Sequence, residues 1–139
     1  MNRPSWKEYA LKLAFVAAER SADPWKKVGA CLLRYDNSVA SLGYNGCPSG
    51  TDIDWSNRDE RRKRVIHAEQ NATRYIKPGE VYLCATTISP CGNCVKLLAS
   101  YGVKLIIFNE LYKEDTFGLE LAKEFGMEVI QIDTNPQII

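Results

Sequence analysis

The sequence contains only one histidine among its 139 residues, and it has almost no excess of charge, with a net charge of +1. The low net charge gives no sign of a polyanion-binding surface over the whole molecule, so we expect no nucleic-acid partner. No apolar run approaches the roughly 18 residues that cross a bilayer, and the N-terminus lacks the apolar segment of a secretory signal. We therefore expect a cytoplasmic location and no membrane partner.

The composition is that of an ordinary globular protein, with 45% hydrophobic and 25% charged residues. A chain of this length fits one domain with one substantial core, and we find no internal repeat, low-complexity segment or linker in it. We therefore expect residues 1–139 to form a single domain.

The number of cysteines is five, which is odd and argues against a disulfide framework in a chain without a secretory signal. Cys31 and Cys84 lie in apolar, strand-like runs and are expected to be small core residues. Cys91 and Cys94 are the one pair at the spacing of metal ligands.

Hydrophobic periodicity and turn residues divide the chain into helices and strands. The predicted helices cover Trp6 to about Arg20, Val65 to Tyr75, Cys91 to Ser100 and Thr116 to Phe125. The predicted strands cover Val28 to Arg34, Val39 to Tyr44, Val81 to Thr86, Lys104 to Phe108 and Met127 to Ile132. The first two strands should form a hairpin, whereas the later ones alternate with helices, which favours right-handed crossovers and parallel pairing. The predicted fold class is α/β, with three layers (α/β/α) around a mixed sheet of about five strands.

The motif Pro90-Cys91-Gly92-Asn93-Cys94 opens one of the predicted helices. Thiols at positions i and i+3 share one face of a helix, and the helix N-terminus favours the thiolate form that binds zinc. A Cys-x-x-Cys pair by itself also fits a thioredoxin-like redox pair or half of a structural zinc site. A four-cysteine site would need a second close pair, which is missing, and a thioredoxin-like pair would typically follow the first strand instead of the third.

The motif His67-Ala68-Glu69 provides what a catalytic zinc site still needs. His67 and the two cysteines make three protein ligands, which leave tetrahedral Zn²⁺ a fourth position for water. The metal lowers the pKa of that water, and Glu69 is placed to accept its proton and return it to the substrate. The two motifs together, H-x-E and P-C-x-x-C, are the signature of zinc-dependent nucleobase deaminases. We therefore predict His67, Cys91 and Cys94 as metal ligands and Glu69 as the catalytic residue of a hydrolytic deaminase.

From about Trp6 to Val129 the sequence also resembles the deoxycytidylate (dCMP) deaminase family of the cytidine deaminase superfamily. Besides the zinc motifs, the resemblance is carried by Arg20-Ser21-Ala22-Asp23-Pro24, Val28-Gly29-Ala30, Gly43-Tyr44-Asn45-Gly46 and Asn71-Ala72. It implies a cytidine deaminase-like fold and the hydrolysis of dCMP to dUMP and ammonia, which feeds thymidylate synthesis. It further implies a homo-oligomer, often a hexamer, that dCTP activates and dTTP inhibits at a separate site assisted by Mg²⁺.

Six residues are candidates for substrate contact. The Asn45 amide could hold the sugar hydroxyl and the base edge, and Arg20 could grip the 5′-phosphate. The resemblance adds Tyr112, which looks like a tyrosine that closes over the phosphate. The remaining candidates are Ser21, Lys27 and Ala68. Structural roles stay open as alternatives: a cation at a helix C-terminus for Arg20, a turn residue for Asn45 and a half-buried tyrosine for Tyr112.

A dense basic run lies just before the metal motif. An effector triphosphate held away from zinc would need cations and close backbone donors, which glycine allows. The candidate effector residues are therefore Gly43, Tyr44, Gly46, Arg58, Arg61, Arg62 and Arg64. A solvated charged face or a subunit contact is the alternative for the run.

Three other functions compete with this interpretation. A nucleoside cytidine or deoxycytidine deaminase is the first, because Gly92 gives the second motif the form Pro-Cys-Gly-x-Cys that is typical of such enzymes. A nucleic-acid editing deaminase would need an extended basic groove that bears aromatic side chains. A zinc-binding module without activity would have no use for Glu69.

Overall fold

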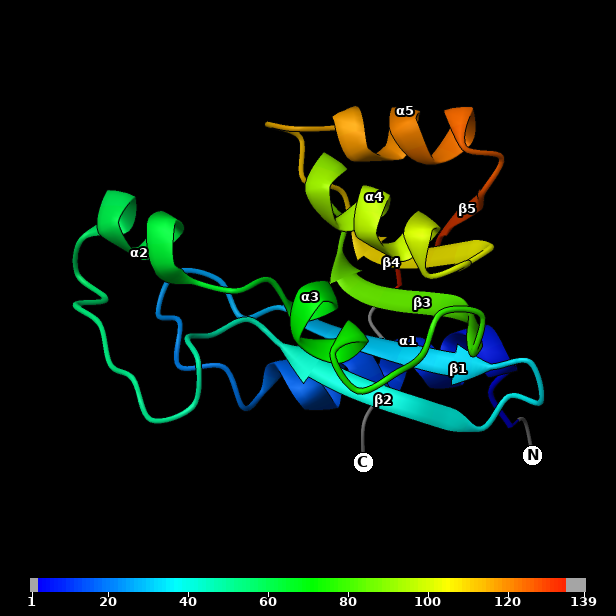
Figure 1. The fold of residues 1–139 in the computed structure, drawn as a ribbon, viewed down its shortest axis with the longest axis horizontal. Coiled ribbons are helices and arrows are strands. Elements are labelled where there is room, and N and C mark those ends of the chain that lie inside the picture. The colour runs from blue at the N-terminus through cyan, green and yellow to red at the C-terminus, as the bar shows by residue number, and fades with distance from the viewer. Residues whose placement is uncertain (1–2, 135–139) are drawn as a thin grey trace.

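The computed structural model describes residues 3–134, which form a mixed five-stranded sheet flanked by helices (Figure 1). The strands are β1 (Gly29–Arg34), β2 (Val39–Tyr44), β3 (Val81–Ile88), β4 (Leu105–Glu110) and β5 (Glu128–Gln131). Their order is β2-β1-β3-β4-β5. β1 is antiparallel to β2 and β3, whereas β4 is parallel to β3 and β5. The predicted mixed sheet, with parallel pairing from the third strand onward, is confirmed.

Helices cover both faces of the sheet (Figure 1). α1 (Trp6–Ala18) packs on one face, and α3 (Ala68–Thr73), α4 (Gly92–Ser100) and α5 (Phe117–Glu124) pack on the other. The predicted three-layer α/β/α architecture is therefore confirmed. Within residues 3–134, no helix combines the length and the apolar character that a membrane crossing requires.

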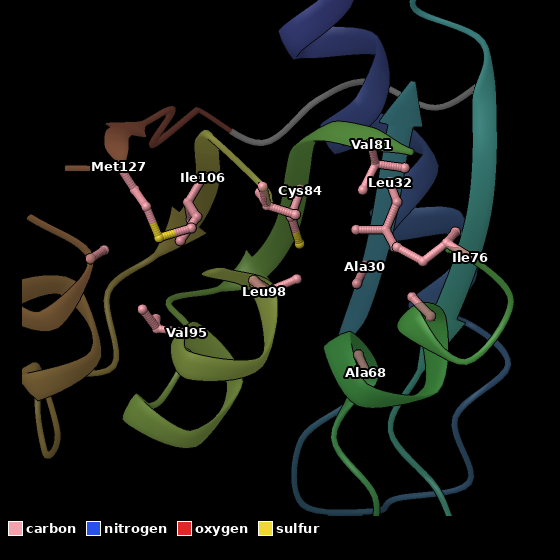
Figure 2. Packing of buried hydrophobic residues seen from close by; sticks show 13 residues of the cluster. Ala30, Leu32, Ala68, Ile76, Val81, Cys84, Val95, Leu98, Ile106 and Met127 are labelled. Carbon is pink, nitrogen blue, oxygen red and sulfur yellow. The ribbon is translucent and has the colours of Figure 1, made fainter. Parts of the chain in front are cut away.

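The core lies on both sides of the sheet because successive side chains of a strand point to opposite faces. Leu32, Cys84 and Ile106 belong to the cluster under α3, α4 and α5 (Figure 2). Cys31 and Ile107, each one position away along its strand, belong to the cluster under α1. Cys31 and Cys84 are both fully buried, as predicted for small core residues.

A helix that the sequence pattern does not predict lies in the long connection between β2 and α3. This helix, α2 (Arg58–Arg64), is displaced from the sheet (Figure 1). The Asn57 side chain begins it by accepting a hydrogen bond from the Glu60 N–H at 3.1 Å. None of its residues is buried, so it carries no apolar periodicity by which the sequence could have revealed it.

The prediction of a helix over residues 65–75 is wrong at its start. Val65 has extended backbone (φ −78°, ψ 128°). Ile66 pairs with Gly46 through two backbone hydrogen bonds of 2.9 and 3.1 Å. These bonds keep the chain extended up to His67, and α3 begins at the next residue. The position of His67, a predicted metal ligand, at the helix start therefore depends on a pairing with a distant loop.

Candidate active site

The first turns of α3 and α4 bring together the three predicted metal ligands. His67 is the N-cap of α3, Cys91 is the N-cap of α4, and Cys94 lies in the first turn of α4. The Nδ1 atom of His67 lies 3.3 Å from the Cys94 Sγ and 3.5 Å from the Cys91 Sγ. The ligand atoms of all three residues lie within 4.8 Å of one another, which is close enough for one metal ion.

The backbone at both helix starts leaves the ligand side chains free of their own helices. His67 (φ −70°, ψ 154°) and Cys91 (φ −76°, ψ 170°) are extended, and neither side chain caps the helix that follows. The His67 N–H instead donates to the Oε1 of Gln70 at 3.0 Å. Imidazole and thiol therefore remain available as ligands.

The turn that carries Cys91 is held in place by the start of α5. Gly118 lies so close to this turn that a Cβ atom there would be 2.1 Å from the Pro90 carbonyl oxygen. Only glycine allows this approach without a shift of the backbone. The turn that carries Cys91 is thus positioned by α5, a helix that comes later in the chain.

The contacts among the three ligands favour a deprotonated sulfur. A hydrogen bond from Cys94 lowers the pKa of the Cys91 thiol to about 3, and His67 contributes in the same direction. The contact with Cys91 raises the pKa of Cys94, and burial adds to this rise. The contact with Cys91 also raises the pKa of His67, against the opposing effect of burial. One imidazole nitrogen and two sulfurs form a donor set that fits Zn²⁺.

Glu69, the second residue of α3, lies beside the ligands without being one of them. Only 3% of the residue is exposed, and burial raises the pKa of its carboxyl group. It lines the same cavity as His67 and Cys91, but the metal-ligand cluster does not include it. A carboxyl group with a raised pKa is better matched to accepting and returning a proton near neutral pH.

A cavity of about 690 Å³ contains this cluster of functional groups. Its volume is within the range of sites that hold small molecules. Around the metal ligands its lining comes from the loop after α1, from α2 and from the segments that follow β3 and β4, and it includes Trp25, Val28, Arg58, Ser89 and Tyr112. The site is therefore assembled from segments that are far apart in the sequence.

The family described as the cytidine and deoxycytidylate deaminase zinc-binding region matches residues 4–110. The chain belongs to this family. Deoxycytidylate deaminase from Mus musculus is 36% identical over 113 residues, which are 74% of this chain and 64% of the mouse protein. The chain thus spans less than two thirds of the length of that relative. ComE operon protein 2 from Bacillus subtilis is 31% identical over 147 residues, covering 100% of this chain and 77% of the relative.

A solved structure extends the likeness to the fold. The dCMP deaminase of cyanophage S-TIM5, in complex with dCMP and dUMP, superposes with a TM-score of 0.80 at 29% identity. The match covers 95% of this chain and 100% of the phage chain. The predicted cytidine deaminase-like fold is therefore confirmed.

The structure divides the predicted substrate residues of this family member into two groups. Asn45, Ala68 and Tyr112 line the cavity. Arg20, Ser21 and Lys27 are not part of its lining. Arg20 and Lys27 are exposed, whereas Ser21 is buried. These three residues stay predicted substrate contacts, although none of them lines the described cavity.

Asn45 is engaged mainly in holding the loop between α1 and β1. Its Oδ1 accepts a hydrogen bond from the Val28 N–H at 2.8 Å. Its Nδ2 donates to the Lys26 carbonyl at 2.9 Å and to the Asp23 carboxylate at 3.2 Å. Ser21 donates to the Asn45 carbonyl at 2.9 Å. Both amide protons are thus used within the protein, and only the second lone pair of Oδ1 is left for a ligand.

The glycine-rich loop predicted to bind an effector has a structural role in the described residues. A Cβ at Gly43 would lie 2.4 Å from the Ala68 carbonyl oxygen, so this glycine lets α3 pack on β2. The Tyr44 carbonyl accepts a hydrogen bond from Asn71 at 2.8 Å. Gly46 forms the pairing with Ile66 described above.

The basic run folds into α2, and its four candidate effector arginines are divided between two hollows. Arg58, Arg61 and Arg62 line the same cavity as His67 and Glu69. Arg64 alone lies on a different hollow of about 600 Å³. The assignment of these arginines to an effector site stays a prediction.

Sequence reasoning missed the role of Asp23, which entered only as part of the stretch Arg20-Ser21-Ala22-Asp23-Pro24 that carries the family resemblance. It is 1% exposed and accepts hydrogen bonds from the Trp25 and Lys26 N–H groups at 2.7 and 3.2 Å. It also forms an ion pair with Arg61 at 2.5 Å. Its partners lie as far as 38 residues away, so no local pattern could have indicated this role.

Proposed function

We propose that this chain hydrolyses dCMP to dUMP and ammonia, with Zn²⁺ held by His67, Cys91 and Cys94. The observation that carries the proposal is the position of Glu69, a buried carboxyl group two residues after one ligand and on the same cavity. Membership of the deaminase family and the likeness to a phage enzyme in complex with dCMP and dUMP support the choice of substrate.

The residues of the site have separate tasks in this reaction. Zinc, when held by the three ligands, provides a water that is acidic enough to act as a nucleophile near neutral pH. Glu69 would accept one proton from the attacking water as its oxygen adds to C4 of the cytosine ring. The carboxyl group gives this proton to the ring nitrogen, and then transfers the second proton of the water to the amino group. The C4–N bond breaks, ammonia leaves, and the oxygen remains as the carbonyl of uracil.

A direct assay tests the proposed substrate. Ammonia release should be measured for dCMP, deoxycytidine and CMP with zinc-loaded protein at matched concentrations. We expect dCMP to have the highest kcat/KM. Equal or faster turnover of deoxycytidine would favour the nucleoside deaminase instead, the alternative to which Gly92 in Pro-Cys-Gly-x-Cys points.

We also propose the finer properties that the family resemblance implies. These are activation by dCTP, inhibition by dTTP, Mg²⁺ bound with the triphosphate, a homohexamer and a cytoplasmic location. The candidates for effector contact are Gly43, Tyr44, Gly46, Arg58, Arg61, Arg62 and Arg64. Repeating the dCMP assay with each triphosphate, with and without Mg²⁺, tests the regulation, and light scattering tests the assembly.

A further inference from the structure

The connection between β4 and α5 forms one wall of the metal cavity. Residues 111–116 make up this connection, and the side chains of Tyr112, Glu114 and Asp115 all line the cavity. None of the residues 111–116 is buried, so burial in the core contributes little to the position of the loop. Its polar contacts therefore decide where these three side chains lie.

Most hydrogen bonds of this loop stay within it or reach only the start of α5. The Tyr112 hydroxyl donates to the Glu114 carboxylate at 2.9 Å, and the Asp115 N–H donates to the Tyr112 carbonyl at 3.3 Å. The Asp115 carboxylate in turn accepts a hydrogen bond from the Phe117 N–H at 3.2 Å. These bonds shape the loop, but they do not fix it relative to the metal ligands.

Ser89 supplies the bond that connects the loop to the rest of the protein. Its Oγ accepts a hydrogen bond from the Tyr112 N–H at 2.8 Å. Across residues 3–134, no other hydrogen bond or ion pair links residues 111–116 to a segment outside this loop and α5. The Ser89 N–H also donates to the Glu110 carbonyl at 2.8 Å, so Ser89 holds the residue before the loop as well.

The place of Ser89 in the chain joins this loop to the metal site. Ser89 directly follows β3 and precedes the predicted ligand Cys91 by two residues. It is 6% exposed and lines the cavity. β3 and β4 are parallel, with Ile88 opposite Glu110, so the ends of both strands lie side by side. One hydroxyl group thus connects the segment that carries Cys91 with the segment that carries Tyr112.

We propose that Ser89 is a positioning residue for the reaction, because its hydroxyl fixes residues 111–116 so that Tyr112 contacts the bound substrate. This inference rests on the proposed dCMP deaminase function and adds to it a residue that acts through Tyr112. Alanine at position 89 would leave the Tyr112 N–H without its acceptor. The loop would then lose its one bond to the β3 segment, and Tyr112 would no longer be held on the cavity.

The experiment is a double-mutant cycle of Ser89→Ala and Tyr112→Ala. The measurements are zinc content, hydrogen exchange of residues 111–116, steady-state kinetics with dCMP and calorimetric binding of the product dUMP. Ser41→Ala is the matched control, since Ser41 is also buried and its hydroxyl donates to the Ala72 carbonyl at 2.8 Å. Ser41 does not line the cavity, so its substitution removes a similar hydrogen bond at a different place.

We expect Ser89→Ala to keep a full equivalent of zinc and to exchange amide hydrogens faster over residues 111–116. KM for dCMP and Kd for dUMP should rise about 3- to 10-fold, as for the loss of one hydrogen bond. The kcat should stay within about twofold of the parent, because a contact made equally in the ground state and the transition state changes KM alone. Ser41→Ala should leave all four measurements at the parent's values.

The cycle separates positioning from direct contact. In the Tyr112→Ala background, Ser89→Ala should raise KM and Kd no further, because the residue through which it acts is gone. An equal effect of Ser89→Ala in both backgrounds overturns the proposal, since Ser89 would then contact the substrate itself. Loss of zinc, unchanged exchange or unchanged KM in Ser89→Ala, an effect that Ser41→Ala shares, or a Tyr112→Ala variant with the parent's KM overturns it as well.

Failure of the proposed function gives a different result. A parent protein that binds dUMP but does not deaminate dCMP refutes the proposed activity. The exchange of residues 111–116 and the dUMP affinities of the four proteins in the cycle then still decide the role of Ser89.

Discussion

Gly43 of β2 lies directly against the carbonyl oxygen of Ala68 at the start of α3. A Cβ at this glycine would be 2.4 Å from that oxygen and 2.6 Å from the backbone nitrogen of Ala72. Ala68 stands between the predicted metal ligand His67 and the predicted catalytic residue Glu69. The distance between a strand and a helix thus sets where both side chains lie.

Gly43→Ala should therefore damage the site through its backbone. Because the added methyl group meets backbone atoms, we expect the free energy of unfolding to fall by about 1–3 kcal/mol, with weaker metal binding. Gly46→Ala, three residues further along the chain, is the control. A Cβ there would have only one neighbour, at 4.0 Å, and should change stability by less than about 0.5 kcal/mol. Urea unfolding and metal analysis of both variants check this, and equal effects at the two positions would contradict it.

Glu69→Gln should keep the metal and lose the reaction. The amide cannot accept the proton of water, whereas His67, Cys91 and Cys94 are unchanged. We expect turnover of dCMP to fall about 10²- to 10⁴-fold. Metal content and steady-state rates are the measurements. Loss of the metal, or turnover within about tenfold of the parent, would argue against the role of Glu69 in proton transfer.

Cys94→Ser should release the metal and lower stability. Cys94 is fully buried and contacts His67, so the metal it helps to hold connects the starts of α3 and α4. We expect a chelator to lower the Tm of the parent protein but to leave that of Cys94→Ser unchanged. Cys91→Ser should behave in the same way. A full equivalent of tightly bound zinc in either variant would show that the ligand is misassigned.

Asp23→Asn should loosen α2. Removing one charge of a buried pair leaves Arg61 without compensation, which costs about 3–5 kcal/mol of stability in comparable cases. Hydrogen exchange of residues 58–64 should rise together with this loss. Glu110→Gln, which breaks the Lys26 pair whose side chains are 48% and 52% exposed, should cost less than about 1 kcal/mol. Similar costs for the two substitutions would mean that the Asp23 pair does not anchor the helix.

Much of the fold and the chemistry of the site could be predicted from local patterns. The alternating and helical periodicities follow from burial on one face, so they mark β1 to β5 and the flanking helices by residue type alone. Cys91 and Cys94 are one helical turn apart, and Glu69 is two residues from His67. The functional residues of each motif are therefore close enough in the sequence for the motif to indicate their chemistry. The sequence by itself determined the mixed sheet, the donor set and the carboxyl group beside it.

Other features were decided only by the tertiary structure, because they depend on contacts between distant segments. α2 buries no residue and is anchored by Asp23, so no hydrophobic periodicity could have predicted its existence or its orientation. The same anchor turns Arg58 and Arg62 towards the metal cavity. Asn45, which a local interpretation gives to the substrate, uses both amide protons to hold the 23–28 loop. Hydrogen bonds and ion pairs across tens of residues have no signature in neighbouring side chains, and the folded backbone alone brings their partners together.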